Sequence, residues 1–368
     1  MREVIELYRN VVIQIATPYS TGTGFYLKGP GLIVTNGHIV QGNREVIIKG
    51  EGMQKQLVRV IYSDPKYDLA FLEVEQTPDL PQVELGVDDK VVEGDPVVAI
   101  GHPFGLKFST TQGIVSNANH VHDNDDVRYI QHDAALNPGN SGGPLINKSG
   151  RILGVNTFII KDGDNMGFSL PAHYISETIT AFQSAGDGVR ARCEGCGNII
   201  SEDEVENNKY CPHCGAKVDL PSMAEEYQPV GVAMTIEELL EKAGHDVRLS
   251  RRGLNNWEIL QGSARINISY HEETGLITGD AYLCMLPQEN IKPLYEFLLR
   301  KNYEVEGLTF SIKSRDIILS LLIYDRYLNL STGMKLFKHL FECADQYDNI
   351  LVENYGAQWK FEDGEEVE

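Results

Sequence analysis

Two kinds of hydrophobic pattern divide the chain. In the N-terminal half, short apolar runs end in polar turns, as in residues 32–40 and 67–74. Short apolar runs bounded by turn residues indicate buried strands. Residues 172–183 have a helical pattern instead, and residues 184–188 are rich in Gly, Ser and Asp, as expected of a flexible linker. We therefore predict an all-β N-terminal domain that ends in one helix.

Residues 230–356 mix helix and strand patterns. Residues 235–243 have an apolar stripe at helical spacing, whereas residues 265–270 alternate with a period of two. The predicted strands are 246–250, 257–261, 264–270, 307–313 and 316–324, and the predicted helices are 235–243, 289–301 and 332–354. This order predicts an α+β domain, a sheet with flanking helices.

Gly139 to Pro144 places a serine in a glycine-rich turn. Gly139 can adopt the positive φ that points its N–H and that of Ser141 at one position, where a carbonyl oxygen would gain negative charge in acyl transfer. Glycine and serine are also common in ordinary turns, so the motif gains weight only if a base and an orienting carboxylate accompany it.

Both groups are present upstream of the serine. His38 follows the apolar run that begins at Leu32, and Asp68 precedes a second strand-like run. Separately, each has a simpler interpretation, His38 as a core histidine and Asp68 as a turn residue. Together with Ser141 they give the order His, Asp, Ser, which favours the chymotrypsin-like double β-barrel over other serine hydrolase folds.

Six segments carry a resemblance to the trypsin-like serine proteases, and within them to the HtrA/Deg branch. They are residues 22–25, 35–40, 68–70, 101–105, 111–116 and 133–144. The resemblance covers roughly residues 8–183 and implies Ser141 as nucleophile, His38 as general base and then acid, and Asp68 as the orienting carboxylate. It also implies that the N–H groups of Gly139 and Ser141 form the oxyanion hole, with no cofactor for catalysis. The PDZ domain that usually accompanies this branch is not recognisable.

The expected specificity pocket contains no acidic residue. The residues predicted to line it are Ala135, Asn156, Thr157, Phe168 and Ser169. Without a buried carboxylate, a pocket has no reason to prefer Lys or Arg, so cleavage after small or medium apolar residues of protein or peptide substrates is expected.

Four of the six cysteines form two C-x-x-C pairs, Cys193 with Cys196 and Cys211 with Cys214. Each pair is followed by a glycine, which suits the turn of a zinc knuckle. Four thiolates close a tetrahedron, so the predicted zinc is structural. Two disulfides are the alternative, suited to an oxidising compartment. His213 is expected to be a bystander between ligands.

The net charge and the first residues of the sequence indicate where the protein is located and which partners it can bind. The 368 residues include 32 basic and 53 acidic ones, a net charge of −21. This balance disfavours binding to nucleic acid or to an anionic membrane. The first residues show no secretory signal, and the longest apolar runs are shorter than a membrane span. We therefore expect a cytoplasmic protein without nucleic-acid or membrane partners.

The expected domains are a protease domain at 1–185, a zinc ribbon at 190–219 that acts as a rigid spacer or docking element, an α+β domain at 230–356 and an acidic tail at 357–368. The layout of the third resembles the type III secretion chaperone-like and YbjN-like domains, which implies a protein client. The whole is predicted to be a serine endopeptidase; the alternative is a catalytically silent adaptor on a protease scaffold. The sequence leaves the oligomeric state open.

Overall fold

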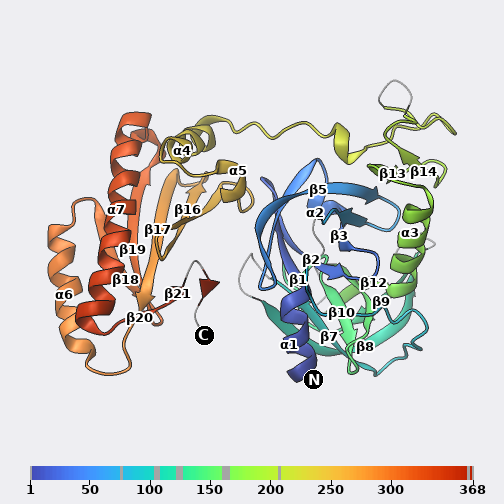
Figure 1. Ribbon diagram of the computed structural model, residues 1–368, viewed down its shortest axis with the longest axis horizontal. Helices are drawn as coiled ribbons and strands as arrows, with labels where there is room; N and C mark the ends of the chain where they lie inside the picture. Colours follow the sequence, from blue (N-terminus) through green and yellow to red (C-terminus); the bar gives the residue numbers. More distant parts are fainter. Residues whose placement is uncertain are drawn as a thin grey trace. The chain divides into compact units, whose positions relative to one another are not determined.

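The computed structural model describes residues 2–74, 78–102, 108–121, 127–159, 166–205, 209–362 and 365–366. The chain forms two compact units, Met1–Tyr227 and Gln228–Glu368 (Figure 1). Residues 103–105 of one motif, and residues 363–364 and 367–368 of the predicted tail, lie outside the described residues.

The first unit begins with helix α1 and a six-stranded antiparallel barrel. The elements are α1 (Arg2–Val11), β1 (Val12–Ala16), β2 (Thr21–Leu27), β3 (Leu32–Asn36), β4 (Glu45–Gly50), β5 (Met53–Asp64) and β6 (Leu69–Leu72). They run in the order β5-β4-β1-β2-β3-β6, and pairing of β5 with β6 closes the barrel. Stacked rings of Tyr62 and Phe71 lie in its core. The sequence analysis did not predict α1, whose buried Tyr8 donates a hydrogen bond to the Gly150 carbonyl at 2.7 Å.

A second closed barrel follows in the same unit. Its strands are β7 (Pro96–Gly101), β8 (Ser109–Val121), β9 (Arg128–His132), β10 (Pro144–Asn147), β11 (Ile152–Ile159) and β12 (Gly167–Pro171), in the order β10-β11-β12-β9-β8-β7. Helix α3 (Ala172–Ser184) ends this part, close to the prediction of 172–183. Two closed barrels confirm the predicted chymotrypsin-like architecture.

The cysteine-rich segment is built into the first barrel. Strand β13 (Arg190–Arg192) pairs in parallel with β5, and β14 (Ile199–Ser201) pairs with β13, which extends the barrel sheet to eight strands (Figure 1). The 3-10 helix η2 (Pro221–Met223) follows this segment, and the Ala224 carbonyl accepts a hydrogen bond from Arg44 at 2.5 Å. Residues 190–219 thus belong to the first unit, and are not the separate domain that the sequence analysis expected.

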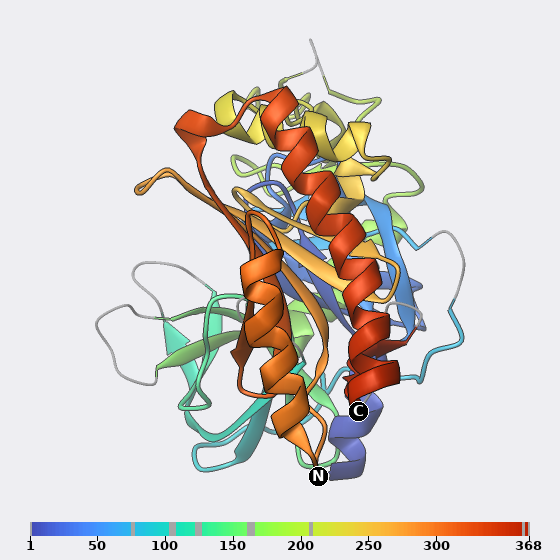
Figure 2. The ribbon, with the colours of Figure 1, turned by 90° about the vertical axis from the view of Figure 1, so that its left-hand side faces the viewer.

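The second unit is a six-stranded antiparallel sheet with helices packed against it. Its main elements are α4 (Gly231–Lys242), α5 (Val247–Ser250), β15 (Asn256–Gln261), β16 (Ala264–His271), β17 (Leu276–Met285), α6 (Ile291–Glu304), β18 (Leu308–Lys313), β19 (Asp316–Tyr324) and α7 (Leu330–Tyr355). The strand order is β15-β16-β17-β19-β18. Helices α6 and α7 lie side by side against the sheet (Figure 2). The predicted α+β architecture is present.

Three local predictions in this unit are wrong. Residues 246–250, predicted as a strand, form α5, because the Asp246 carboxylate caps a helical turn by accepting from the Leu249 N–H at 3.1 Å. The central strand β17 was missed, since Gly279 takes one of the buried positions of its alternation and supplies no apolar side chain. The predicted tail at 357–368 begins inside the sheet, where β20 (Gln358–Trp359) pairs with β17.

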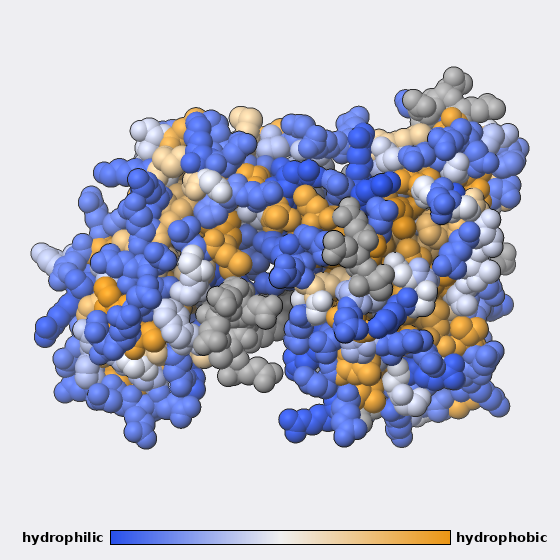
Figure 3. All heavy atoms as spheres, viewed as in Figure 1, coloured by the Kyte–Doolittle hydropathy of each residue, from blue (hydrophilic) through white to orange (hydrophobic). Residues whose placement is uncertain are grey.

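Hydrophilic residues cover much of the face shown in Figure 3. Among the residues that the structure describes, no helix has both the length and the apolar character to cross a bilayer.

Candidate active site

His38 and Asp68 are in direct contact on the first barrel. His38 belongs to the short helix α2 (Gly37–Val40), which follows β3. Its Nδ1 atom lies 2.7 Å from Oδ2 of Asp68, and its backbone N–H donates to Oδ1 of the same carboxylate at 2.8 Å. The side chains are 48% and 29% exposed, respectively. A carboxylate on Nδ1 holds the imidazole so that Nε2 can exchange a proton with a substrate or nucleophile.

Asp68 adopts an unusual backbone conformation. Its φ of 49° lies in the left-handed region, which non-glycine residues occupy only when their surroundings hold them there. The Asp68 carbonyl accepts hydrogen bonds from the Gly37 N–H at 3.0 Å and from Nδ2 of Asn36 at 2.9 Å. The segment that carries His38 thus fixes both ends of the aspartate, its carbonyl and its carboxylate.

Ser141 lies in the loop between β9 and β10 of the second barrel. Gly139 has a φ of 102°, the positive value that the sequence analysis expected. In the part of the chain that the structure describes, neither the Gly139 N–H nor the Ser141 N–H donates to a protein acceptor. The Ser141 hydroxyl donates to the Thr157 carbonyl at 3.3 Å, and no hydrogen bond joins it to His38 among these residues.

Thr23 on β2 connects the two barrels at this loop. Its buried hydroxyl donates to the Gly139 carbonyl at 2.6 Å and accepts from the His102 N–H at 2.9 Å. Its backbone N–H donates to the Ser141 carbonyl at 2.9 Å. The sequence analysis noted Thr23 only as part of a glycine-rich strand, because nothing local indicates a partner on another barrel.

Gly142 has no room for a side chain. A Cβ atom there would lie 2.0 Å from the Thr23 carbonyl oxygen, and its φ of 83° is unfavourable for other residues. The glycine next to the serine therefore allows the serine loop to pack directly against β2.

The five predicted pocket residues differ in exposure. Asn156, Phe168 and Ser169 are fully buried, Thr157 is 5% exposed, and Ala135 is exposed. A substrate side chain could therefore contact only Ala135 and a small part of Thr157 without rearrangement of the others.

A chain of buried hydrogen bonds explains why two of these residues are polar. The Ser169 hydroxyl donates to Oδ1 of Asn156 at 3.0 Å and lies 3.0 Å from Nε2 of His132. Asn156 in turn binds the serine loop through its backbone, which accepts from Gly142 at 2.8 Å. Burial lowers the pKa of His132 to about 4, so this histidine is neutral at pH 7.

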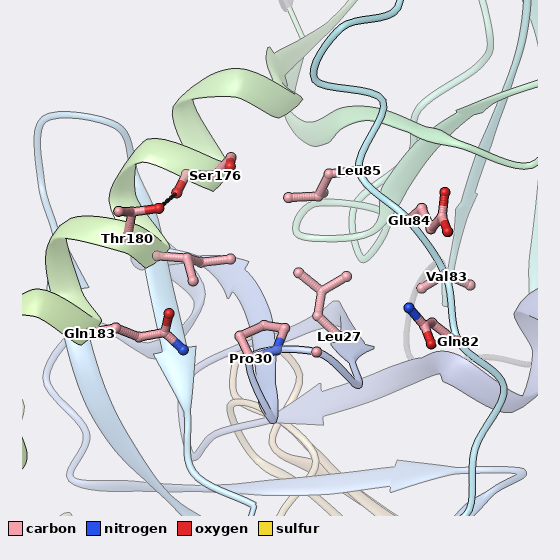
Figure 4. A pocket seen from close by; sticks show the side chains of 11 residues that line it. Leu27, Pro30, Gln82, Val83, Glu84, Leu85, Ser176, Thr180 and Gln183 are labelled. Carbon is pink, nitrogen blue, oxygen red and sulfur yellow. Dashed lines mark hydrogen bonds between the residues drawn. The ribbon is translucent and has the colours of Figure 1, made fainter.

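A surface pocket of about 450 Å³ lies elsewhere in the first unit (Figure 4). Its lining includes Leu27, Leu85, Ile179 and Thr180, from β2, a connecting loop and α3. None of the predicted catalytic or specificity residues lines it. We assign this pocket no part in the catalytic chemistry.

The sulfur atoms of Cys193, Cys196, Cys211 and Cys214 all lie within 4.8 Å of one another. The closest pairs are 3.5 Å and 3.7 Å apart, too long for disulfide bonds and close to the roughly 3.8 Å edge of a zinc–thiolate tetrahedron. A hydrogen bond from the backbone of Asn198 lowers the pKa of the Cys196 thiol to about 7. The donor set fits a zinc ion that is closed to further ligands.

The family comparison agrees with this geometry. Residues 22–155 match the family model of the trypsin-like peptidase domain. The match contains His38, Asp68 and Ser141, and it confirms the resemblance on which the sequence analysis relied.

Curated relatives of the peptidase domain include two probable periplasmic serine endoproteases of the DegP-like kind. The protein from Chlamydia trachomatis serovar D is 38% identical over 174 residues, 46% of this chain and 35% of the relative. The protein from a Marinomonas species is 37% identical over 176 residues, 47% of this chain and 37% of the relative. The first half of the chain is therefore similar to serine endoproteases of the DegP-like kind, and the chain spans only about a third of the length of these relatives.

Among solved structures, an HtrA-type protease with a tripeptide matches at 29% identity and a TM-score of 0.47, covering 51% of this chain and 65% of its own.

The predicted cytoplasmic location is wrong. The matching relatives are named periplasmic serine endoproteases, which points to the periplasm. The prediction rested on the first residues and the short apolar runs of the sequence, and neither feature carries a chemical signature of one compartment.

Proposed function

We propose that this protein is a serine endopeptidase that hydrolyses peptide bonds in unfolded or recruited proteins. The observation that carries the proposal is the His38–Asp68 pair together with the N–H groups of Gly139 and Ser141, which have no acceptor among the described residues. These are the base, the orienting group and the oxyanion donors that acyl transfer to a serine requires.

The catalytic steps follow from these positions. His38 Nε2 removes the proton of the Ser141 hydroxyl as its oxygen attacks the scissile carbonyl, and the N–H groups of Gly139 and Ser141 stabilise the oxyanion. The protonated His38 then donates that proton to the leaving amine, which yields an acyl-enzyme. Water, deprotonated by His38, hydrolyses the ester and restores Ser141. Asp68 keeps the imidazole oriented throughout.

For the first step the Ser141 hydroxyl must leave the Thr157 carbonyl and turn toward His38. A serine side chain has a single torsion that moves its oxygen, and rotation about it releases the hydroxyl from the Thr157 carbonyl. Catalytic hydrogen bonds are often absent before substrate binds, so this geometry is compatible with the proposed role.

Specificity for small or medium apolar residues is part of the proposal. Ala135, the exposed member of the predicted pocket, contributes only a methyl group, and none of the pocket residues is acidic. A peptide library cleaved mainly after Arg or Lys would contradict this specificity.

We further propose that Cys193, Cys196, Cys211 and Cys214 hold one structural zinc ion. When bound, the ion supplies a cross-link between two knuckles and takes no part in peptide hydrolysis. Support comes from the mutual distances of the four sulfur atoms and from the glycines that follow each pair, Gly197 and Gly215, which both have a φ of 74°.

The second unit is proposed to bind a protein client. Its helix α6 presents Tyr295, Leu299 and Tyr303 to solvent, with exposures of 42%, 73% and 95%. Residues four apart lie on one face of a helix, so these side chains form one apolar stripe.

A silent adaptor is the competing function, favoured by the bond from Ser141 to Thr157 in place of one to His38. The deciding experiment uses the full chain and its Ser141→Ala variant, with an unfolded casein-like substrate and a fluorophosphonate probe. Labelling and cleavage that disappear with Ser141 would establish the endopeptidase. Absence of both from the parent protein would favour the adaptor.

A further inference from the structure

We propose that the four-cysteine site regulates the peptidase through Arg192 and Asp64, a positioning pair that joins the zinc knuckle to the turn presenting Asp68. This inference rests on the proposed function, both the endopeptidase and the zinc site. It differs from a purely structural zinc because it assigns the metal an effect on the active site.

The strand that leads into Cys193 is part of the catalytic barrel. In the parallel pairing of β13 with β5, Arg190 is opposite Tyr62 and Ala191 is opposite Ser63. The next residues along the two strands are Arg192 and Asp64. The register therefore brings the residue that precedes the first zinc ligand next to the last residue of β5.

Arg192 binds Asp64 and the knuckle simultaneously. Its Nε donates to Oδ2 of Asp64 at 2.7 Å, and its Nη1 donates to the Gly197 carbonyl at 2.9 Å. Asp64 has no exposed surface, and the Arg192 side chain is 15% exposed. Tyr62 also donates to Oδ2, at 2.8 Å. One guanidinium thus connects a buried carboxylate of the barrel to the loop between Cys193 and Gly197.

Asp64 in turn holds the catalytic turn. Its Oδ1 accepts from the Tyr67 N–H at 3.3 Å, and it is paired with Leu69 across the β5–β6 register. Asp68 lies between these two partners. The guanidinium of Arg192 also packs over the Tyr67 ring, 5.4 Å from its centroid. The residues on either side of Asp68 are therefore held by groups that depend on Arg192.

The consequence of metal loss follows from the charge of Asp64. Without the ion the metal cross-link between the two knuckles is lost, the loop between Cys193 and Gly197 loosens, and the Gly197 carbonyl no longer holds Arg192 in place. A buried carboxylate that loses its cation is strongly destabilised, so the end of β5 must rearrange to hydrate it. Asp68, whose left-handed φ requires support from its neighbours, then no longer orients His38.

The test compares Arg192→Met with a matched control, Arg151→Met. Arg151 forms an ion pair with Asp89 at 3.1 Å at the second barrel, so its loss also removes an arginine–aspartate contact from the unit. For each variant of the full chain, zinc content is measured by native mass spectrometry, hydrogen exchange by peptide mass analysis, and kcat and KM with a peptide substrate.

Arg192→Met should keep one zinc, speed exchange in residues 64–69 at least tenfold, and lower kcat about tenfold with little change in KM. Arg151→Met should change neither the exchange of this turn nor kcat. A loss of kcat equal in the two variants, or parent-like kcat in Arg192→Met, would overturn the inference. These outcomes differ from general destabilisation, which would speed exchange throughout the unit.

Removal of zinc gives a readout that does not require activity. In Ser141→Ala, chelation should speed exchange in residues 64–69 by a similar factor. The double variant Asp64→Asn, Arg192→Met lacks both charges, so chelation should no longer change the exchange rate of residues 64–69. This double variant also replaces Arg192→Met if the single variant does not fold.

Unchanged exchange after zinc removal, or a chain that takes up no zinc, would overturn the inference. If the parent protein neither cleaves peptide nor reacts with a fluorophosphonate, the proposed endopeptidase fails, while the exchange measurement still decides whether the two sites are coupled.

Discussion

Removing one buried hydroxyl should weaken both the fold and the chemistry of the first unit. Thr23→Val keeps the shape of the side chain but deletes the donor to the Gly139 carbonyl and the acceptor of the His102 N–H. Each buried polar group left unpaired costs about 1–3 kcal/mol, so the variant should lose about 2–5 kcal/mol of stability. Thr178→Val is the matched control, because the buried Thr178 hydroxyl has no partner among the described residues.

The effect of Thr23→Val on catalysis follows from Gly139. Removal of an oxyanion donor costs about 100-fold to 1,000-fold in kcat. Thr23 only restrains the residue that carries such a donor, so we expect about a tenfold loss, equivalent to about 1.4 kcal/mol. KM should change little, since the hydroxyl is buried away from substrate.

The assay can separate the two units. Both tryptophans, Trp257 and Trp359, belong to the second unit, so tryptophan fluorescence in urea reports that unit alone. Hydrogen exchange follows the unfolding of the first unit in urea. The rate of fluorophosphonate labelling reports the reactivity of Ser141 beside the proposed oxyanion donors. The reasoning is refuted if Thr23→Val has the same stability and the same labelling rate as the parent protein. It is also refuted if Thr178→Val loses as much stability as Thr23→Val.

Two further predictions concern buried charges. Burial lowers the pKa of His102 and of His132 to about 4, so between pH 6.5 and 4 the unfolded chain binds more protons than the folded one. The first unit should therefore lose stability as pH falls through this window, by at most about 3 kcal/mol for each histidine. His132→Gln should flatten the pH dependence of the urea midpoint of the first unit. Glu237 binds Arg251 through both carboxylate oxygens at 2.9 Å and 2.8 Å and accepts a hydrogen bond from Trp257 at 3.1 Å. Glu237→Leu leaves the Arg251 charge without its partner and should destabilise the second unit by about 3–5 kcal/mol, measured by tryptophan fluorescence in urea.

Local motifs made parts of the site predictable. The glycines around Ser141 and the strand-end positions of His38 and Asp68 are properties of short segments, and the structure has the expected positive φ at Gly139. The C-x-x-C pairs are equally local, because their spacing and following glycines describe a knuckle without reference to the rest of the fold.

One error arose where a tertiary contact overrides a local pattern, and another where a local helix cap was overlooked. In β17, Gly279 supplies no apolar side chain to the alternation, yet a Cβ there would lie 2.9 Å from Leu340 of α7, so the glycine allows the helix to approach the sheet. In residues 246–250, the Asp246 cap outweighed the strand-like composition. The packing of Leu340 against Gly279 is not visible in the strand itself, whereas the Asp246 cap is local and was overlooked.

The sequence by itself therefore determined the chemistry of the residues and the backbone conformations of their short motifs. The tertiary structure alone decided which distant segments meet: Thr23 with Gly139 across 116 residues, and Asp64 with Arg192 across 128. A hydrogen bond is directional and effective only within about 3 Å, so such pairings depend on how the barrels close and how β13 aligns with β5. No spacing rule along the chain encodes that alignment, which is why the link between the four-cysteine segment and the turn that presents Asp68 is visible only in the fold.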